Sequence, residues 1–268
     1  MKKVKYIYVV LVYKNIEVIE GFYQSIKNQD SYQVVVVDSF SSDEVRKEVK
    51  SICEAHGWDF VGIENKGYGY GNNVGTKYVI EHYDFDFLFI SNSDIEIKSL
   101  DSLDSYKNEC IVIAPKTVMK TGKHQNPDTP WELKFIYPML SYALNHKTGL
   151  VYTMCHICTR LNRELFRLYA CVVKKERYKI FSAHGSFIIF TKRAVETLYP
   201  FFDDEMFLYN EEWYLALKAR AKNVPIYHIP SLEVLHLEGA SSGSIVYSEH
   251  DRESFNILNY KRKNNLIK

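Results

Sequence analysis

The chain has 268 residues, of which 46% are hydrophobic, 15% aromatic and 25% charged. This composition is typical of a folded, water-soluble protein and excludes a wholly disordered chain, because so many aromatic side chains bury a large apolar surface on folding. The 34 basic and 33 acidic residues leave a formal net charge of +1, so the charge gives no indication of nucleic-acid binding.

Strand and helix patterns alternate over the first 115 residues. Short runs rich in β-branched and aromatic residues predict strands at 6–12, 33–37, 60–63, 85–90 and 110–114. Apolar residues at helical spacing predict helices at 16–26, 41–53 and 74–83. For the second helix we expect Ser41 as the N-cap, Glu44 completing a capping box, and Gly57 at the end.

This alternation predicts an α/β fold with a Rossmann-like, mostly parallel sheet. Ligands of such sheets lie outside the carboxyl ends of the strands. We therefore expect Asp38, the turn after Ile63 and the residues after Ile90 to converge.

The alternation stops between about residue 116 and residue 180, where Tyr, Leu, Lys and Arg dominate. Leu161, Leu165 and Leu168 fall at helical spacing and predict an apolar stripe. The basic residues around them are Arg160, Arg163, Arg167, Lys174, Lys175, Arg177 and Lys179. We expect this region to contact anionic lipid at a membrane surface; the alternative is the solvated face of a helix. A strand at 186–190 and a helix at 192–198 follow.

The five cysteines are an odd number and do not indicate a disulfide framework. Cys155 and Cys158 form a CxxC pair, but no second pair follows at zinc-site spacing, so we interpret them as reduced thiols. The apolar run from Tyr6 to Tyr13 is short, is followed by Lys14 and has no cleavage site, unlike an export signal. No stretch is apolar enough to span a bilayer. We therefore expect a cytoplasmic protein.

The segment from Asn65 to Gly75 is rich in glycine. Glycines before a helix suit a backbone that must approach a phosphate closely. The segment lacks the Gly-Lys-Ser/Thr of a Walker A loop, and it does not follow the first strand as a dinucleotide fingerprint would. A tight turn that binds no ligand is the alternative.

Asp94 closes the segment Ser91–Asp94, which follows the predicted strand at 85–90. A carboxylate at the carboxyl end of a strand is a natural ligand for Mg²⁺ or Mn²⁺. A simple turn is the alternative. Further along, His236 stands alone in an apolar run, a setting in which a histidine is more often structural than a ligand.

Acidic and large apolar residues are interleaved from Phe202 to Glu212. Glu211 and Glu212 are adjacent at a predicted helix start, where like charges raise one another's pKa, as suits a general base. The alternative is that they only complement the helix dipole.

The order of these segments resembles the family 2 glycosyltransferases, and within them the rhamnosyltransferase-like branch that builds bacterial cell-surface polysaccharides. The matching segments are Val35–Asp43, Asn65–Gly75, Ser91–Asp94, Gly185–Phe187, Phe207–Leu215 and His236–Ser241. The first resembles Val-Asp-Asn-x-Ser-x-Asp with Ser39 in place of Asn. The third resembles Leu-Asn-Pro-Asp, a variant DxD motif, with Ser93 in place of Pro.

The segment Phe207–Leu215 resembles Phe-Leu-Tyr-x-Glu-Asp-x-Asp-Leu with two departures. Glu212 stands where the family has its catalytic Asp, and Tyr214 stands where a further Asp is usual. Glu212 is one methylene longer, so the geometry of a base at this position must adjust.

The resemblance implies a GT-A fold in which residues 1–115 bind the nucleotide-sugar donor. Residues 116–268 would form a helical, basic acceptor-binding and catalytic half, continuous with the first in one domain. The implied activity is an inverting, metal-dependent hexosyltransferase of O-antigen or capsule synthesis, with dTDP-rhamnose as the first candidate donor. The partners would be a nucleotide-sugar donor and a glycan or lipid-linked acceptor at the inner face of the cytoplasmic membrane, and no nucleic acid.

The resemblance also assigns roles to residues. Glu212 would deprotonate the acceptor hydroxyl with support from Glu211, and Asp94 with His236 would hold Mg²⁺ or Mn²⁺. The residues implied in donor binding are Val12, Tyr13, Asp38, Asn65, Gly67, Tyr68, Gly69, Asn73 and Asn92, and those in acceptor binding are Gly185 and Ser186. The alternative is a non-catalytic nucleotide-sugar or glycan-binding module of an assembly complex, which would tolerate loss of the carboxylates.

Overall fold

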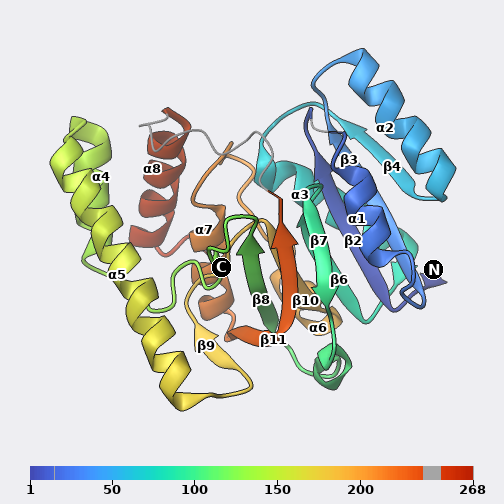
Figure 1. The fold of residues 1–268 in the computed structure, drawn as a ribbon. Coiled ribbons are helices and arrows are strands. Elements are labelled where there is room, and N and C mark those ends of the chain that lie inside the picture. Colours follow the sequence, from blue (N-terminus) through green and yellow to red (C-terminus); the bar gives the residue numbers. More distant parts are fainter. Residues whose placement is uncertain (15, 238–248, 268) are drawn as a thin grey trace.

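A mixed β-sheet forms the centre of the computed structural model, which describes residues 1–14, 16–237 and 249–267 (Figure 1). The strands lie in the order β4 (Asp59–Ile63), β3 (Tyr32–Ser39), β2 (Tyr6–Val12), β6 (Phe87–Asn92), β10 (Phe187–Thr191), β8 (Val112–Met119), β11 (Ile226–His236) and β7 (Ile95–Ser99). Strand β9 (Tyr178–Ile180) pairs with β11, and β1 (Lys2–Lys3) pairs with β5 (Tyr83–Asp84) in a separate two-stranded sheet.

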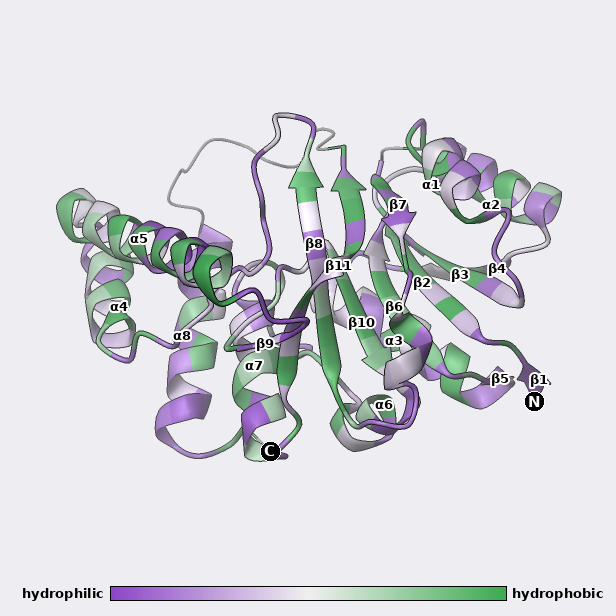
Figure 2. Ribbon diagram, turned by 60° about the horizontal axis from the view of Figure 1, so that its bottom comes forward, coloured by the Kyte–Doolittle hydropathy of each residue, from purple (hydrophilic) through white to green (hydrophobic). Residues whose placement is uncertain are grey.

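The part of the sheet formed by β4, β3, β2 and β6 is parallel, as the sequence predicts. Its strands are apolar runs because helices cover both faces (Figure 2). Val9 and Val35 pack with α3 (Tyr68–His82), α6 (Lys192–Leu198) and α7 (Glu211–Ala221). Tyr8 and Val34, on the opposite face, pack with α1 (Ile19–Ile26) and α2 (Asp43–His56).

The remainder of the sheet is mixed rather than parallel. Strand β10 is antiparallel to both β6 and β8, and β11 is parallel to β8 but antiparallel to β7. The overall class is the predicted α/β class. Residue 115, where the sequence analysis divides the chain into two halves, lies inside β8.

Residues 116–180, where the strand–helix alternation of the sequence stops, fold mainly as helices. It contains α4 (Ile136–His146) and the long α5 (Gly149–Val173), which pack together, and α4 also contacts α8 (Glu249–Lys263). A short 3₁₀ helix, η1 (Leu103–Tyr106), precedes β8. None of the helices in the described ranges is long and apolar enough to cross a membrane.

Helix α2 begins one residue later than predicted. The Oγ atom of Ser42, not of Ser41, accepts a hydrogen bond from the backbone N–H of Val45 at 3.3 Å, so Ser42 is the N-cap. Gly57 ends the helix in the left-handed conformation, with φ +67°, as predicted.

The glycine-rich segment is helical from Tyr68 onward, which corrects the prediction of a turn up to residue 73. Helix α3 begins at Tyr68 and presents glycines to the sheet. A Cβ atom on Gly75 would lie 2.5 Å from Cγ1 of Val9 and 2.6 Å from Cγ2 of Val37. The glycines therefore allow the helix to approach β2 and β3 closely. The sequence did not predict this contact, because phosphate-binding turns have the same glycine-rich pattern.

Gly75→Ala is expected to destabilise the protein by about 1–3 kcal/mol, the usual cost of forcing a methyl group into a filled core. Urea denaturation measures the change. Gly149→Ala is the matched control, because a Cβ atom at Gly149 meets nothing within 4 Å, and it should be neutral or slightly stabilising. Equal stability of the two variants would contradict the packing role of Gly75.

Candidate active site

A pocket of about 310 Å³ lies where the carboxyl end of β6, the residues before β10, the start of α7 and the end of β11 meet. It is lined by Tyr68, Asn92, Gln125, His184, Gly185, Ser186, Leu208, Tyr209, Asn210, Glu211, Glu212 and His236. Segments from both predicted halves of the chain therefore form one pocket at the sheet edge where the sequence predicts ligands.

Seven residues predicted for the site line this pocket. They are Tyr68, Asn92, Gly185, Ser186, Glu211, Glu212 and His236. Asp94 joins them through its contact with His236. Gly239 and Ser241, which complete the last motif of the sequence analysis, lie outside the described residues.

The two adjacent glutamates occupy the first turn of α7 in different surroundings. The Glu211 side chain is buried, and its Oε1 atom has no hydrogen-bond partner among the described residues. Glu212 is partly exposed, and its Oε1 atom accepts a hydrogen bond from the backbone N–H of Gly185 at 3.1 Å. A Cβ atom at position 185 would lie 2.5 Å from this oxygen, so the contact requires glycine there.

Burial raises the pKa of both glutamates well above 4.5. The charge of Asp128 adds to the effect on the pKa of Glu212, while backbone N–H groups at the helix start and at Gly185 oppose it. For Glu211, the charge of Glu212 raises the pKa further. The pair therefore exchanges protons at a higher pH than ordinary glutamates, as a general base working near neutral pH requires.

Asp94 and His236 form a second polar pair, contributed by the turn after β6 and the end of β11. Both side chains are buried, and Nε2 of His236 lies 3.2 Å from Oδ1 of Asp94. Nδ1 of His236 lies 2.7 Å from the amide oxygen of Gln125, which only accepts, so Nδ1 carries a proton. This arrangement turns the Nε2 atom toward the carboxylate.

The carboxylate and imidazole of this pair fit a divalent cation, since Mg²⁺ favours carboxylate oxygen and Mn²⁺ accepts imidazole as well. No group of three or more His, Cys, Asp or Glu side chains that could hold a metal exists within residues 1–14, 16–237 and 249–267. A cation at Asp94 and His236 would therefore need further ligands of another kind, such as amide oxygens, phosphate oxygens or water.

Asp38 lies further along the same edge of the sheet. It is paired with Val12 in the register of β3 and β2, and the preceding Leu11 is paired with Asn92. Nε of Arg46 lies 2.5 Å from Oδ2 of Asp38, whereas Oδ1 is buried without a hydrogen-bond partner in the described structure. A buried carboxylate oxygen without a partner is costly, and the role of Asp38 in donor binding stays a prediction.

Asn65 and Tyr13 lie, like Asp38, at the carboxyl ends of the parallel strands. The side-chain oxygen of Asn65 accepts hydrogen bonds from the Ser39 hydroxyl and from the Gly67 N–H, both at 3.2 Å. Tyr13 follows β2 and is exposed. Together with Val12 and Asp38, these residues form a row at the carboxyl ends of the parallel strands.

Three other residues predicted to bind the donor make contacts within the protein. Gly67 has φ +105° and lies against the backbone of Phe207, and Gly69 lies against the side chain of Phe202. The amide of Asn73 donates to the carbonyl of Phe202 at 2.9 Å and accepts from its N–H at 3.2 Å. In this structure they hold the start of α3 against the acidic segment, and their role in donor binding stays a prediction.

Five pocket residues were not predicted from the sequence, namely Gln125, His184, Leu208, Tyr209 and Asn210. Nδ1 of His184 accepts a hydrogen bond from the Ser186 N–H at 3.2 Å, and burial lowers the pKa of His184 to about 3, so the ring is neutral. Tyr209 and Asn210 have positive φ angles in the turn that leads into α7. His184, Tyr209 and Asn210 lie within or beside matched motifs, and this position could have indicated them as site residues. Gln125 lies in a loop that contains no matched motif.

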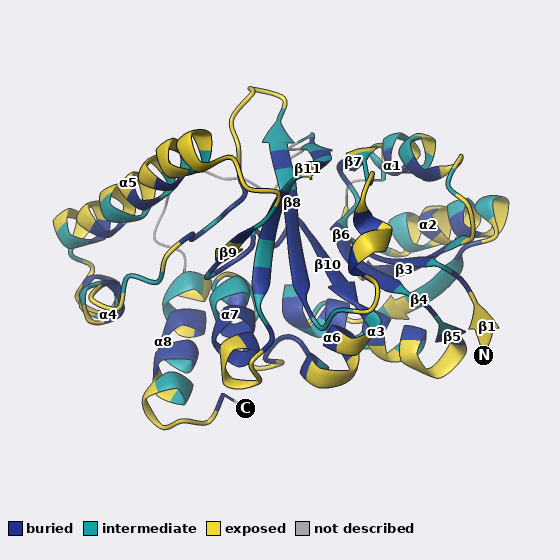
Figure 3. Ribbon diagram, turned by 90° about the horizontal axis from the view of Figure 1, so that it is seen from below, coloured by how far each residue is buried: buried dark blue, intermediate teal, exposed yellow. Residues whose placement is uncertain are grey.

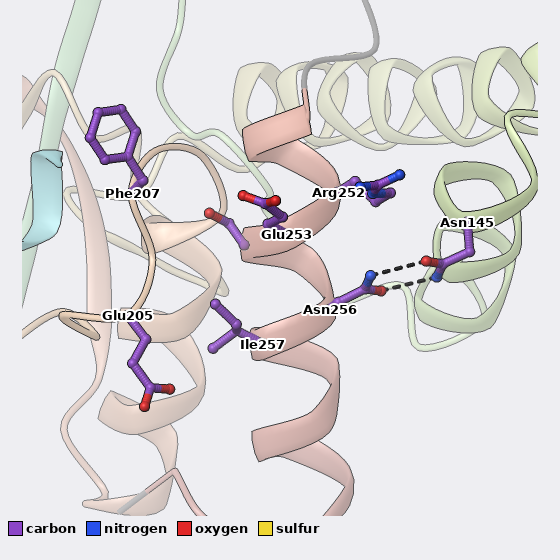
Figure 4. A pocket seen from close by; sticks show the side chains of 8 residues that line it. Asn145, Glu205, Phe207, Arg252, Glu253, Asn256 and Ile257 are labelled. Atoms are coloured by element: carbon purple, nitrogen blue, oxygen red, sulfur yellow. Dashed lines mark hydrogen bonds between the residues drawn. The ribbon is translucent and has the colours of Figure 1, made fainter. Parts of the chain in front are cut away.

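A second pocket lies between α8, α4 and the segment before α7 (Figure 4). The amides of Asn145 and Asn256 donate to each other across it, both at 3.0 Å. None of the residues predicted for the site lines this pocket. The predicted catalytic and acceptor-side residues therefore line the first pocket and not this one, while Asp38 and Asn65 lie further along the sheet edge.

No protein-family model matches the chain. The chain is 25% identical over 233 residues to the low-salt glycan biosynthesis hexosyltransferase Agl10 of Haloferax volcanii, across 85% of this chain and 66% of that protein. It thus spans just under two thirds of the length of this relative.

Solved structures of glycosyltransferases share the fold. GalNAc-T7 with UDP, GalNAc and Mn²⁺ superposes with a TM-score of 0.62 at 12% identity, over 97% of this chain and 47% of that chain. S. aureus TarS superposes with a TM-score of 0.54 at 16% identity, over 87% of this chain and 37% of that chain. TarS 1–349 in complex with UDP gives a TM-score of 0.54 at 15% identity, over 86% and 60%. The chain therefore has the predicted GT-A fold.

Gly185→Ala is expected to push the flexible Glu212 side chain away from the Gly185 N–H, because the new methyl group would overlap Oε1. The loss of this hydrogen bond to a charged group should destabilise the protein by about 1.5–3 kcal/mol. A double-mutant cycle with Glu212→Ala tests the cause. Once the carboxylate is removed, Gly185→Ala should cost at least about 1 kcal/mol less. Additive effects in urea denaturation would show that the two residues do not interact.

Proposed function

We propose that the chain is an inverting, metal-dependent glycosyltransferase that moves one hexose from a nucleotide donor to a glycan or lipid-linked acceptor. The observation that carries this proposal is the pocket itself, in which the Asp94–His236 pair and the Glu211–Glu212 pair meet at the ligand-binding edge of a GT-A fold. The hexosyltransferase relative and the solved structures with UDP and Mn²⁺ support it.

Asp94 and His236 would hold the cation, Mg²⁺ or Mn²⁺. When bound, such a cation supplies positive charge to the diphosphate leaving group. The protonated Nδ1 of His236 is held by Gln125, which fixes the ring with Nε2 toward the cation. Asn92, at the carboxyl end of β6, lines the same pocket and would contact the donor.

Glu212 would act as the base. The Gly185 N–H holds one of its carboxylate oxygens, and the other would accept the proton of the acceptor hydroxyl as that hydroxyl attacks the anomeric carbon from the face opposite the diphosphate. Gly185 and Ser186 would bind the acceptor. The buried Glu211 would support the base, since its nearby charge or proton changes the proton affinity of Glu212.

The nucleoside would lie along the row that contains Asp38. The unpaired Oδ1 of Asp38 would accept a hydrogen bond from the base or ribose, and Arg46 would keep the carboxylate oriented. Val12, Tyr13 and Asn65 would line the same subsite. dTDP-rhamnose remains our first candidate donor, and UDP-sugars are its competitors because TarS binds UDP-GlcNAc.

We place the reaction in surface polysaccharide synthesis, O-antigen or capsule, on the cytoplasmic side of the membrane. The relative in glycan biosynthesis supports the pathway class, and five free thiols are compatible with a reducing compartment.

A panel of nucleotide sugars, including dTDP-rhamnose, UDP-GlcNAc and UDP-GalNAc, tests the reaction and the metal together. We expect release of nucleoside diphosphate from one donor in Mn²⁺ or Mg²⁺ and none in EDTA. Asp94→Asn should lower both the rate and the calorimetric affinity for that donor by about 10–100-fold or more. Asp101→Asn, an exposed carboxylate on the loop after β7, is the control. Full activity in EDTA contradicts the metal role, and donor binding without transfer to any acceptor would favour a binding module.

Glu212→Gln should keep donor affinity and lose about 10²–10⁴-fold in kcat, the usual contribution of a general base. Glu211→Gln should lose less, partly through KM. Because the pKa of the base is raised, wild-type activity should be present at high pH and fall as the pH drops through that raised value, well above 4.5. Glu212→Gln should lack this decline. The reverse order of the two variants would move the base to Glu211.

A further inference from the structure

Helix α5 carries a stripe of exposed apolar side chains along its whole length. The stripe consists of Leu150, Met154, Ile157, Leu161, Leu165, Leu168 and Val172. Successive members are four, three and four residues apart, and this series occurs twice. The mean spacing is close to a helical turn, so the stripe stays on one side of the helix for about 33 Å.

The opposite side of α5 fixes the helix to the protein. Phe166 and Cys155 of α5 are buried on this side, and the side chain of Asn162, also on α5, donates to the carbonyl of Trp131 at 2.6 Å. Figure 3 shows the outer side of α5 exposed along its length, and Figure 2 shows apolar residues there. Leu150 is 77% exposed and Val172 82% exposed. A stripe of this size, on which none of the described residues packs, indicates a docking surface.

Ion pairs within the protein reduce the basic cluster predicted from the sequence. Arg163 lies 3.9 Å from Asp128, Arg167 lies 2.6 Å from Glu164, and Arg177 lies 2.7 Å from Glu109. On α5 and the residues that flank it, the exposed cations that make no ion pair with any described residue are Lys147, Arg160, Lys174, Lys175 and Lys179. Lys147 precedes the stripe and the three other lysines follow it, so both ends of the stripe carry positive charge.

The positive ends distinguish between two possible occupants of the stripe. If α5 paired with α5 of a second copy, an antiparallel arrangement would bring Lys147 of each copy near Lys174 and Lys175 of the other. A parallel arrangement would bring like ends together. Both arrangements oppose positive charges, whereas an anionic phospholipid surface complements them and accepts the apolar stripe between its headgroups.

We propose that α5 docks the protein on an anionic membrane surface, with its stripe in the headgroup region and the five cations against the lipid phosphates. The inner side of α5 is close to the candidate active site. The Tyr152 hydroxyl donates to Asp251 at 3.2 Å, and Asp251 accepts from Asn210, a pocket residue, at 2.9 Å. Docking would therefore hold the pocket near the membrane. Only the link between docking and a lipid-linked acceptor rests on the proposed function.

Co-sedimentation of the full chain with vesicles tests the proposal in the absence of donor. We expect binding to phosphatidylcholine vesicles that contain phosphatidylglycerol, and weaker binding at high salt or without the anionic lipid. Lys174→Glu with Lys175→Glu should weaken binding by at least about 20-fold. Lys47→Glu with Lys50→Glu, exposed on α2, makes the same charge change away from α5 and should have a much smaller effect.

A second pair of variants tests the apolar stripe. Leu161→Gln should weaken binding by about fivefold, the worth of one partly buried aliphatic side chain, whereas Ile80→Gln on α3 should not. A protein that stays in the supernatant with anionic vesicles at low salt overturns the proposal. A dimer in solution that Leu161→Gln dissociates also overturns it, in favour of a second copy. Transfer activity is measured separately, so failure of docking and failure of the proposed reaction are distinguishable.

Discussion

Two consecutive carboxylates, the buried Glu211 and the partly exposed Glu212, occupy the first turn of α7, and the residues around the pocket are arranged about them. The helix start and the Gly185 N–H direct backbone donors at these charges. Gly185 is positioned in turn by the Tyr68 hydroxyl, which donates to its carbonyl at 2.6 Å. A chain that places negative charge in a low-dielectric pocket has to hold that pocket rigidly, because a small displacement leaves a charge without its donor.

The two polar pairs of the pocket are suited to different positively charged species. Asp94 and His236 are suited to a cation, whereas Glu211 and Glu212 hold their protons more tightly than free glutamates do. Departing negative charge and an arriving proton would therefore be received at different walls of one cavity. Each wall is fixed to a different strand or helix end, Asp94 and His236 to β6 and β11 and the glutamates to α7.

The sequence predicted the parallel strands well, because their apolar runs are continuous and helices cover both faces. It also predicted Glu211, Glu212, Asp94 and His236 as neighbours of a site, through motifs rather than periodicity. It did not predict that the glycines of α3 pack against Val9 and Val37, since the same letters serve a turn and a close helix–sheet contact. Gln125 was missed because long-range hydrogen bonds leave no local pattern.

Strand β10 has a consequence for how this protein can evolve. It comes late in the chain, yet it lies between β6 and β8 and hydrogen-bonds to both. Suppose that recombination joined the first hundred residues of one ancestor to the remainder of another. Strand β10 of the second ancestor would then have to pair with β6 of the first as well as with its own β8. Loops and surface helices do not pair with a strand on each side, so they are the parts that can be exchanged between lineages. Changes of substrate would then arise from residues at the rim of the pocket, while the mixed sheet is inherited as a unit.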